Sequence, residues 1–148
     1  MPSYSNGSVI DPSEAARMAI GAGRPRDRYG RPLRTGADPL TAYPGVPHRS
    51  FVSGSDAWHE ALAYLTEDLP FHAHEVFEQR WRCAPASERA AWRSLAQWGA
   101  ALTHAARGNR VGAHRLALRA REGLMAATLV DPIDPEVVES SLQRLLAT

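Results

Sequence analysis

Apolar residues recur at helical spacing along most of the chain beyond residue 53. Over residues 55–68 and just after them, Trp58, Leu62, Leu65 and Leu69 keep the spacing of one buried helical face. Similar patterns predict further helices at 70–83, from 87 to 107, at 110–128 and from 134 onward. No segment alternates between polar and apolar residues for long enough to predict a strand.

Proline and glycine mark the ends of these predicted helices. Pro70 can open the second helix, because a residue in the first turn needs no backbone N–H. Pro85 interrupts the chain after that helix, and Gly108 followed by Asn109 is a stop signal followed by a new cap. Short connections favour antiparallel neighbours, so the sequence predicts an all-α fold, a compact bundle of about five antiparallel helices.

The first 50 residues differ from the rest in composition. They hold seven of the 11 prolines, six of the 11 glycines and seven arginines. We interpret residues 1–50 as an extended N-terminal arm and residues 51–148 as the helical domain. Asp11, Pro12 and Gly21 are start and stop signals for one short helix at 12–20. The remaining arm is interpreted either as a strap or disordered segment, or as a set of arginines that contact phosphate.

Charge and cysteine content narrow the class of protein. The net charge is +1 and all 17 basic residues are arginine, so the whole-chain charge does not favour a nucleic-acid partner. The single cysteine, Cys83, excludes an internal disulfide framework and suits a reducing compartment. No apolar run approaches the roughly 18–20 residues that cross a bilayer. The N-terminus lacks the pattern of a signal peptide. We therefore expect a cytoplasmic protein with no membrane partner.

The second predicted helix places ionisable groups where core residues are expected. At about 100° per residue, His74 and Glu78 fall within the same arc as its large apolar side chains. These apolar side chains are Phe71, Phe77 and Trp81. His74 and Glu78 are also four residues apart, so their side chains are neighbours on the helix.

The third predicted helix contains a second unusual run. Residues 94–106, SLAQWGAALTHAA, include no Lys, Arg, Asp or Glu, which is typical of a central helix buried on several sides. Gln97 and His104 are seven residues apart and share a face that also carries small alanines. We therefore expect His74, Glu78, Gln97 and His104 to face one polar pocket between the second and third helices.

Buried polar groups need partners, which leaves three interpretations of this pocket. In the first, Glu78 accepts a hydrogen bond from a histidine, and the cluster only fixes the register of two helices. In the second, the pocket binds a small-molecule ligand, with Glu78 and His74 as the catalytic acid–base groups. In the third, His74, Glu78 and His104 bind a divalent metal such as zinc, iron or manganese.

Five further residues are candidates for the lining of the pocket. Trp81 is a core anchor or a pocket wall, and Phe71 shares its arc. Glu75 lies beside that arc and either pairs with a surface neighbour or faces the pocket. Arg107 either stays solvated or brings an anion to the pocket mouth, and Asn109 caps the fourth helix or joins the site.

These residues carry a resemblance to a known family. The segment FHAHEVFEQRW, followed by WRSLAQWGAALTHAARGNRVGAHRLALRARE, resembles the DUF309 family of small helical proteins. That family is recognised by a HEvxExxW-like helix, then a glutamine-bearing helix that ends in His and is followed by Gly-Asn. The matching positions are Phe71, His74, Glu75, Glu78, Trp81, Gln97, His104, Gly108 and Asn109. The segment GRPRDRYGRPL is similar to the arms of actinobacterial members. The resemblance implies an all-α fold and no established reaction.

Two classes of function follow from the sequence. The first is a small pocket protein, whose most specific form is a metal-assisted hydrolase with a bound water as nucleophile. The second is a non-catalytic interaction module that contacts protein or RNA through the arm or through helix 110–128. That helix carries Arg110, Arg115, Arg119 and Arg121. The sequence leaves open whether the protein is an enzyme.

Overall fold

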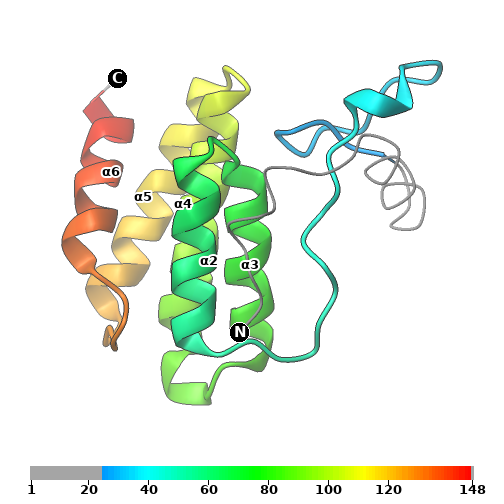
Figure 1. The fold of residues 1–148 in the computed structure, drawn as a ribbon. Coiled ribbons are helices and arrows are strands. Elements are labelled where there is room, and N and C mark those ends of the chain that lie inside the picture. Colours follow the sequence, from blue (N-terminus) through cyan, green and yellow to red (C-terminus); the bar gives the residue numbers. More distant parts are fainter. Residues whose placement is uncertain (1–24, 148) are drawn as a thin grey trace.

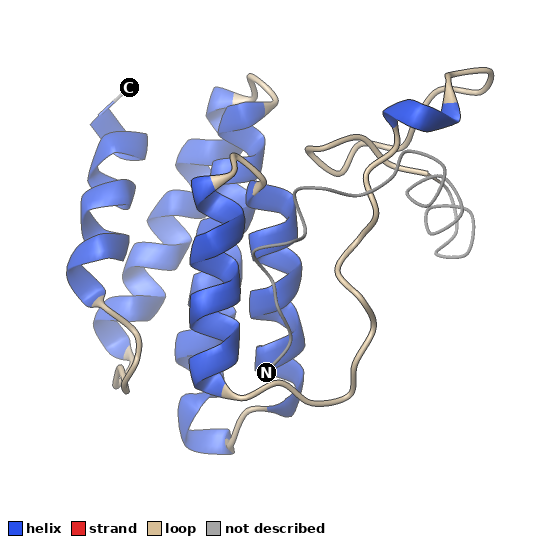
Figure 2. Ribbon diagram, in the orientation of Figure 1, coloured by secondary structure: helices blue, strands red, loops and turns tan. Residues whose placement is uncertain are grey.

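The computed structural model describes residues 25–147. Its elements are η2 (Pro39–Thr41), α2 (Gly54–Thr66), α3 (Pro70–Cys83), η3 (Ala86–Glu88), α4 (Arg89–Ala106), α5 (Arg110–Ala126) and α6 (Pro135–Ala147). The five α-helices run alternately up and down, as Figures 1 and 2 show. Within residues 25–147 there is no strand, and only an isolated bridge joins Arg26 to Pro32. The predicted all-α antiparallel bundle is therefore confirmed, whereas the short helix expected at 12–20 lies outside the described residues.

Local side-chain and proline signals set the helix boundaries. The Ser53 hydroxyl accepts a hydrogen bond from the Asp56 N–H at 3.0 Å and caps α2. Pro70 occupies the first turn of α3. The Asn109 Oδ1 accepts from the Gly112 N–H at 2.9 Å and caps α5, as its place after Gly108 predicts.

Aromatic residues from α2, α3 and α4 form the centre of the core. The Phe77 ring lies 6.4, 6.3 and 6.0 Å from the rings of Trp58, Trp92 and Trp98, centre to centre. All four side chains are buried. Such ring pairs add to the free energy gained from burying their apolar surface. The central α4 packs against both α3 and α5, which explains its long run without charged residues.

Helices α3 and α4 approach each other closely at a glycine of α4. A Cβ atom on Gly99 would lie 2.8 Å from the His74 Cα, closer than real Cβ contacts. This position therefore excludes any side chain, and it fixes which face of α4 meets α3.

Residues 25–50, here called the strap, lie against the helical bundle. Figure 1 shows the first part of this segment to the side of α3, near the start of that helix, and the remainder running alongside α3 to the start of α2. The His72 Nε2–H donates to the Pro44 carbonyl at 2.8 Å, and the Gln79 amide donates to the Pro47 carbonyl at 2.9 Å. The strap interpretation of the arm thus describes residues 25–50.

The first half of the strap is fixed at the turn between α2 and α3 and at the end of α4. The Tyr29 hydroxyl donates to Asp68 at 2.6 Å, and Arg28 donates to the Glu67 carbonyl at 2.9 Å. The Arg107 Nε–H donates to the Tyr29 carbonyl at 2.9 Å.

No helix of the described residues is long and apolar enough to span a membrane.

Candidate functional site

His74 and Glu78 are neighbours on α3, as their spacing predicts. The His74 Nε2 lies 3.8 Å from the Glu78 Oε2, and the Glu78 Oε1 lies 3.6 Å from the Arg82 Nη2. The side chains of His74 and Glu78 are 22% and 31% exposed, so both lie at the edge of the core. The ring of His74 also packs at 5.8 Å from that of Phe71. The pair is therefore shielded on one side and open to solvent on the other.

The environment of His74 favours a neutral imidazole. Burial lowers the pKa of His74, Glu78 opposes this effect, and the positive charges of Arg82 and Arg107 reinforce it. Its Nδ1 atom is buried and has no hydrogen-bond partner among the described residues. Most buried polar atoms in proteins have a partner, so a buried nitrogen without one is an exception that calls for a physical explanation.

Glu75 lies beneath the strap and not in an exposed surface pair. Burial raises the pKa of Glu75, while a hydrogen bond with the Val46 backbone and the nearby Arg26 charge act against this rise. The Oε1 atom of Glu75 is buried without a hydrogen-bond partner in the described chain. A Cβ atom on Gly45 of the strap would lie 3.7 Å from this oxygen. We call His74, Glu75 and Glu78 the α3 polar cluster.

Arginines from three segments surround the α3 polar cluster. Arg26 lies over the Phe71 ring, with its Cζ 5.7 Å from the ring centre. Arg107, expected at the pocket mouth, instead holds the strap through the Tyr29 carbonyl, and burial is the main cause that lowers its pKa. Arg82 is exposed and extends from the last turn of α3. Positive charge therefore flanks the cluster. Two of its three sources also have a structural role, since Arg26 donates to the Gly30 carbonyl within the strap at 2.6 Å.

The predicted place of His104 in this cluster is wrong. Its Nδ1 accepts a hydrogen bond from the Asn109 amide at 3.0 Å, at the turn between α4 and α5. Position 104 is about 140° around α4 from Gly99, the residue that faces His74. Burial is the main cause that lowers the pKa of His104, followed by the charge of Arg107. Asn109 thus acts as a helix cap and a partner of His104.

Gln97 also faces away from α3. It lines a shallow hollow of about 440 Å³ between α4 and α5, together with Arg119 and Glu122. Position 97 is about 160° around the helix from Gly99. The prediction failed because α4 is flanked by two helices, and its alanine-rich face was assigned to the wrong neighbour.

No metal-binding set is gathered in residues 25–147. No group of three or more His, Cys, Asp or Glu side chains converges there closely enough to hold a metal ion. The predicted ligand set of His74, Glu78 and His104 is therefore not assembled. Trp81, the expected pocket wall, lies half-buried beneath Arg93, whose Cζ is 5.7 Å from its ring centre.

Three buried polar side chains with structural roles escaped the sequence analysis. His72 donates to the strap, and Glu60 receives two hydrogen bonds from Arg49, at 2.9 and 2.5 Å. Arg80 donates to the Val52 carbonyl and to Glu88. The sequence signal available for Glu60 was its spacing, since it lies three residues after Ala57, which is also buried.

The arginines proposed as partner contacts divide into two groups. In the strap, Arg28 and Arg31 donate to backbone carbonyls of the helical bundle. On α5, the side chains of Arg110, Arg115 and Arg119 are exposed. The strap arginines therefore have a structural role that the sequence analysis did not assign to them.

Titration of the buried histidines gives a prediction for stability. Burial lowers the pKa of His72 and of His74 from their ordinary value of 6.5. Below that pH the unfolded chain binds these protons before the folded protein does, so the free energy of unfolding should fall as the pH decreases. The raised pKa of Glu75 acts in the opposite direction, because the folded carboxyl group takes its proton above the ordinary 4.5.

Urea unfolding from neutral to acidic pH, on one histidine variant and one Glu75 variant, tests which side chains cause the change in stability. His72→Gln retains an N–H donor for Pro44 and should weaken the loss of stability on acidification. Glu75→Gln should make that loss steeper. An unchanged pH profile in His72→Gln would show that another group causes the acid sensitivity.

The central part of the chain is similar to one protein family. The family model described as "Domain of unknown function (DUF309)" matches residues 58–116. The match spans all of α3 and α4, including the α3 polar cluster, and confirms the resemblance for this part of the chain. No curated protein and no solved structure matches the chain. The actinobacterial origin stays a prediction.

Proposed function

We propose that the protein binds a small ligand with an acidic group at the α3 polar cluster, and that His74 exchanges a proton with it. The observation that carries the proposal is the buried Nδ1 of His74, which has no hydrogen-bond partner within residues 25–147. A buried imidazole nitrogen without a partner costs free energy, and a ligand whose acidic group forms a hydrogen bond with this nitrogen removes this cost.

Electrostatics support a ligand of this charge. Arg26 and Arg82 approach the cluster from the strap and from the end of α3, and their side chains are exposed. Guanidinium groups bind carboxylates and phosphates through paired hydrogen bonds. The exposed edge of Glu78 marks the side from which a ligand would approach.

The pKa values of His74 and Glu75 are shifted in opposite directions. The pKa of His74 is lowered, which favours a proton-accepting imidazole near neutral pH. The pKa of Glu75 is raised, which favours a proton-donating carboxyl group. Environments that separate two pKa values in this way are typical of acid–base pairs. In this proposal His74 is the base, Glu75 is the acid, and Glu78 tunes the charge of His74.

NMR titration of the His74 ring tests the proposal. Glu78→Gln should lower the pKa of His74, because the Glu78 charge raises it, whereas Arg82→Gln should raise this pKa. Acetate or phosphate, added at constant ionic strength, should raise the pKa of His74 in the wild-type protein by stabilising the imidazolium. His104 is an internal control, because it lies outside the cluster and should respond less.

The two variants and the two anions test separate points. If both substitutions shift the pKa as stated and neither anion moves the His74 signals, the electrostatic description holds and the proposed binding is wrong. The free energy of unfolding of Glu78→Gln should stay within about 1 kcal/mol of the wild-type value, since the ion pairs of Glu78 are partly exposed. A change in binding would then not result from unfolding.

A further inference from the structure

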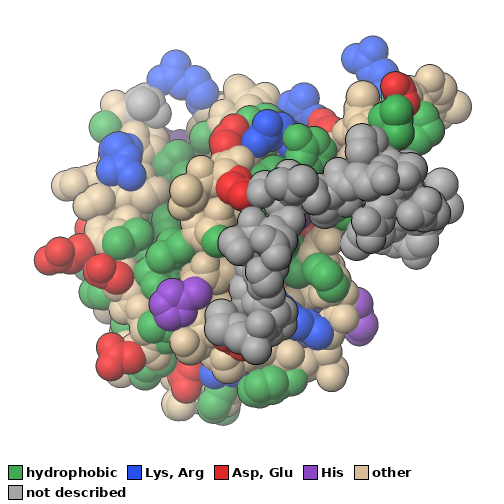
Figure 3. Space-filling model, viewed as in Figure 1, with side chains coloured by type: hydrophobic (Ala, Val, Ile, Leu, Met, Phe, Trp, Pro, Cys, Tyr) green, Lys and Arg blue, Asp and Glu red, His purple; other side chains and the backbone are tan. Residues whose placement is uncertain are grey.

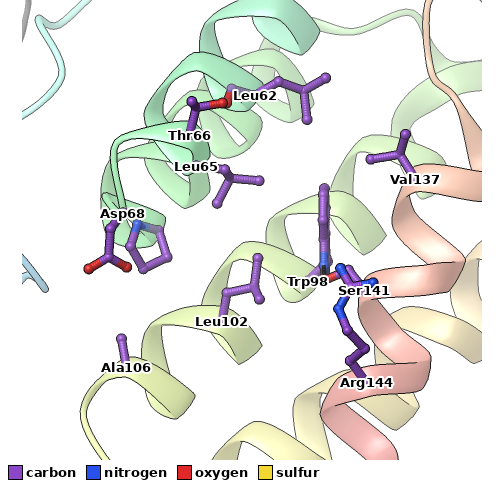
Figure 4. A pocket seen from close by; sticks show the side chains of 11 residues that line it. Leu62, Leu65, Thr66, Asp68, Trp98, Leu102, Ala106, Val137, Ser141 and Arg144 are labelled. Carbon is purple, nitrogen blue, oxygen red and sulfur yellow. Dashed lines mark hydrogen bonds between the residues drawn. The ribbon is translucent and has the colours of Figure 1, made fainter.

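A cleft opens between α2, α4 and α6, on a different face from the α3 polar cluster. Its volume is about 600 Å³, within the range of small-molecule sites. Figure 4 shows Leu62 and Leu65 on one wall, Leu102 on the floor and Val137 on the opposite wall. In the space-filling view, hydrophobic side chains gather at the surface between α6 and α2 (Figure 3). The cleft is therefore an apolar site accessible from solvent.

Most polar side chains that line the cleft already have partners. The Thr66 hydroxyl donates to the Leu62 carbonyl at 3.0 Å, and Asp68 accepts from the Tyr29 hydroxyl at 2.6 Å. On the floor, the Trp98 indole N–H donates to the Ser141 hydroxyl at 2.8 Å. These groups do not require hydrogen bonds from a ligand.

Arg144 differs from these cleft residues in its lack of a polar partner within the described residues. It extends from α6 into the cleft, and Figure 4 shows its side chain directed toward Ser141 and Trp98. No ion pair or side-chain hydrogen bond joins it to another residue in the described part of the chain. A positive charge without a partner beside an apolar surface selects a ligand that combines an acidic group with an apolar body.

We propose that this cleft binds an apolar monocarboxylate of medium chain length. The carboxylate pairs with the Arg144 guanidinium near Ser141, where two parallel hydrogen bonds can form. The chain covers Leu62, Leu65 and Leu102 and removes their surface from water. This site is independent of the ligand proposed for the α3 polar cluster, since the two are lined by different side chains.

Isothermal titration calorimetry with decanoate, below its micelle concentration, tests the site on the full chain. Decanoate should bind more tightly than decanol or decylamine, because only the acid pairs with Arg144. Arg144→Gln should weaken decanoate binding about tenfold or more while leaving decanol binding nearly unchanged. Arg119→Gln, on the exposed face of α5, is the matched control and should bind decanoate like the wild type. Decyl phosphate separates a carboxylate site from a general anion site.

Blocking the cleft provides a second test. Leu102→Trp fills the floor and should abolish binding of both decanoate and decanol, with circular dichroism confirming the helical fold. Equal binding of decanoate to wild type and Arg144→Gln would overturn the proposal, as would binding that survives Leu102→Trp. Sedimentation that shows a dimer dissociated by Leu102→Arg would instead assign the cleft to a second copy of the chain, and would also overturn it.

Discussion

Replacing Arg49 with methionine is expected to lower the free energy of unfolding by about 3–5 kcal/mol. The Glu60 side chain is 2% exposed, and the Arg49 guanidinium donates to both of its carboxylate oxygens, at 2.9 and 2.5 Å. Arg49 also donates to Gln79 at 2.7 Å, so it joins the strap to α2 and α3. Without Arg49 the carboxylate of Glu60 stays buried and loses its countercharge, which costs more than the lost contacts alone. Urea unfolding of Arg49→Met at neutral pH measures the effect.

Two further variants separate the lost ion pair from other causes. Arg49→Met combined with Glu60→Leu removes both charges and should recover most of the stability, because apolar residues often replace a buried ion pair without loss. Arg34→Met changes an exposed arginine of the same strap and should stay within about 0.5 kcal/mol of the wild type. A loss below about 1 kcal/mol in Arg49→Met would mean that water replaces the guanidinium at Glu60.

The sequence predicted the helical bundle well because its signals are local. Helix α3 was expected at 70–83 and runs from Pro70 to Cys83, and α5 was expected at 110–128 and runs from Arg110 to Ala126. Proline in the first turn and an asparagine cap after glycine act on the backbone within one helical turn. Such signals can be read without knowledge of the tertiary structure.

The strap was only partly predictable, because its contacts use groups without a sequence pattern. His72 and Gln79 donate to the carbonyl oxygens of Pro44 and Pro47, and every residue has such an oxygen. The proline and glycine content showed that residues 1–50 would not form long helices. It could not show which surface residues 25–50 would cover. As a result, a surface pair was one of two alternatives left open for Glu75, whereas the strap half-buries this residue.

The candidate site shows the same division between local and long-range information. Spacing alone placed His74 and Glu78 together, because they belong to one helix. The partners on α4 required knowing which face meets α3, and Gly99 decides this through its close approach to His74. A glycine within a helix is a weak signal for such contact in a single sequence. The local half of the site was therefore predicted, and the half that spans two helices was wrong.

Strap and site are also linked through Phe71. This ring packs against His74 on one side, and Arg26 of the strap lies over it. The family match begins at residue 58, so the strap lies outside it. A substitution that displaces the strap should therefore alter the site while leaving the matched helices intact.

Gly30→Ala tests this link between the strap and the site, and it should destabilise the protein more than Gly36→Ala does. Gly30 is buried with φ +77°, and a Cβ atom there would lie 2.3 Å from the Phe71 ring. Gly36 has φ +86° and nothing within 4 Å of such an atom, so Gly36→Ala carries the backbone strain without the collision. Gly30→Ala should therefore lower the free energy of unfolding by about 1–3 kcal/mol more than Gly36→Ala does.

In Gly30→Ala, hydrogen exchange should show lost protection at the Leu33 and Tyr43 amides, which donate within the strap, and unchanged protection in α4. Adding Phe71→Leu should recover part of the lost stability of Gly30→Ala and should not stabilise Gly36→Ala. Equal stability of the two alanine variants would contradict the close packing of Gly30 on Phe71, and with it the control of the site by the strap.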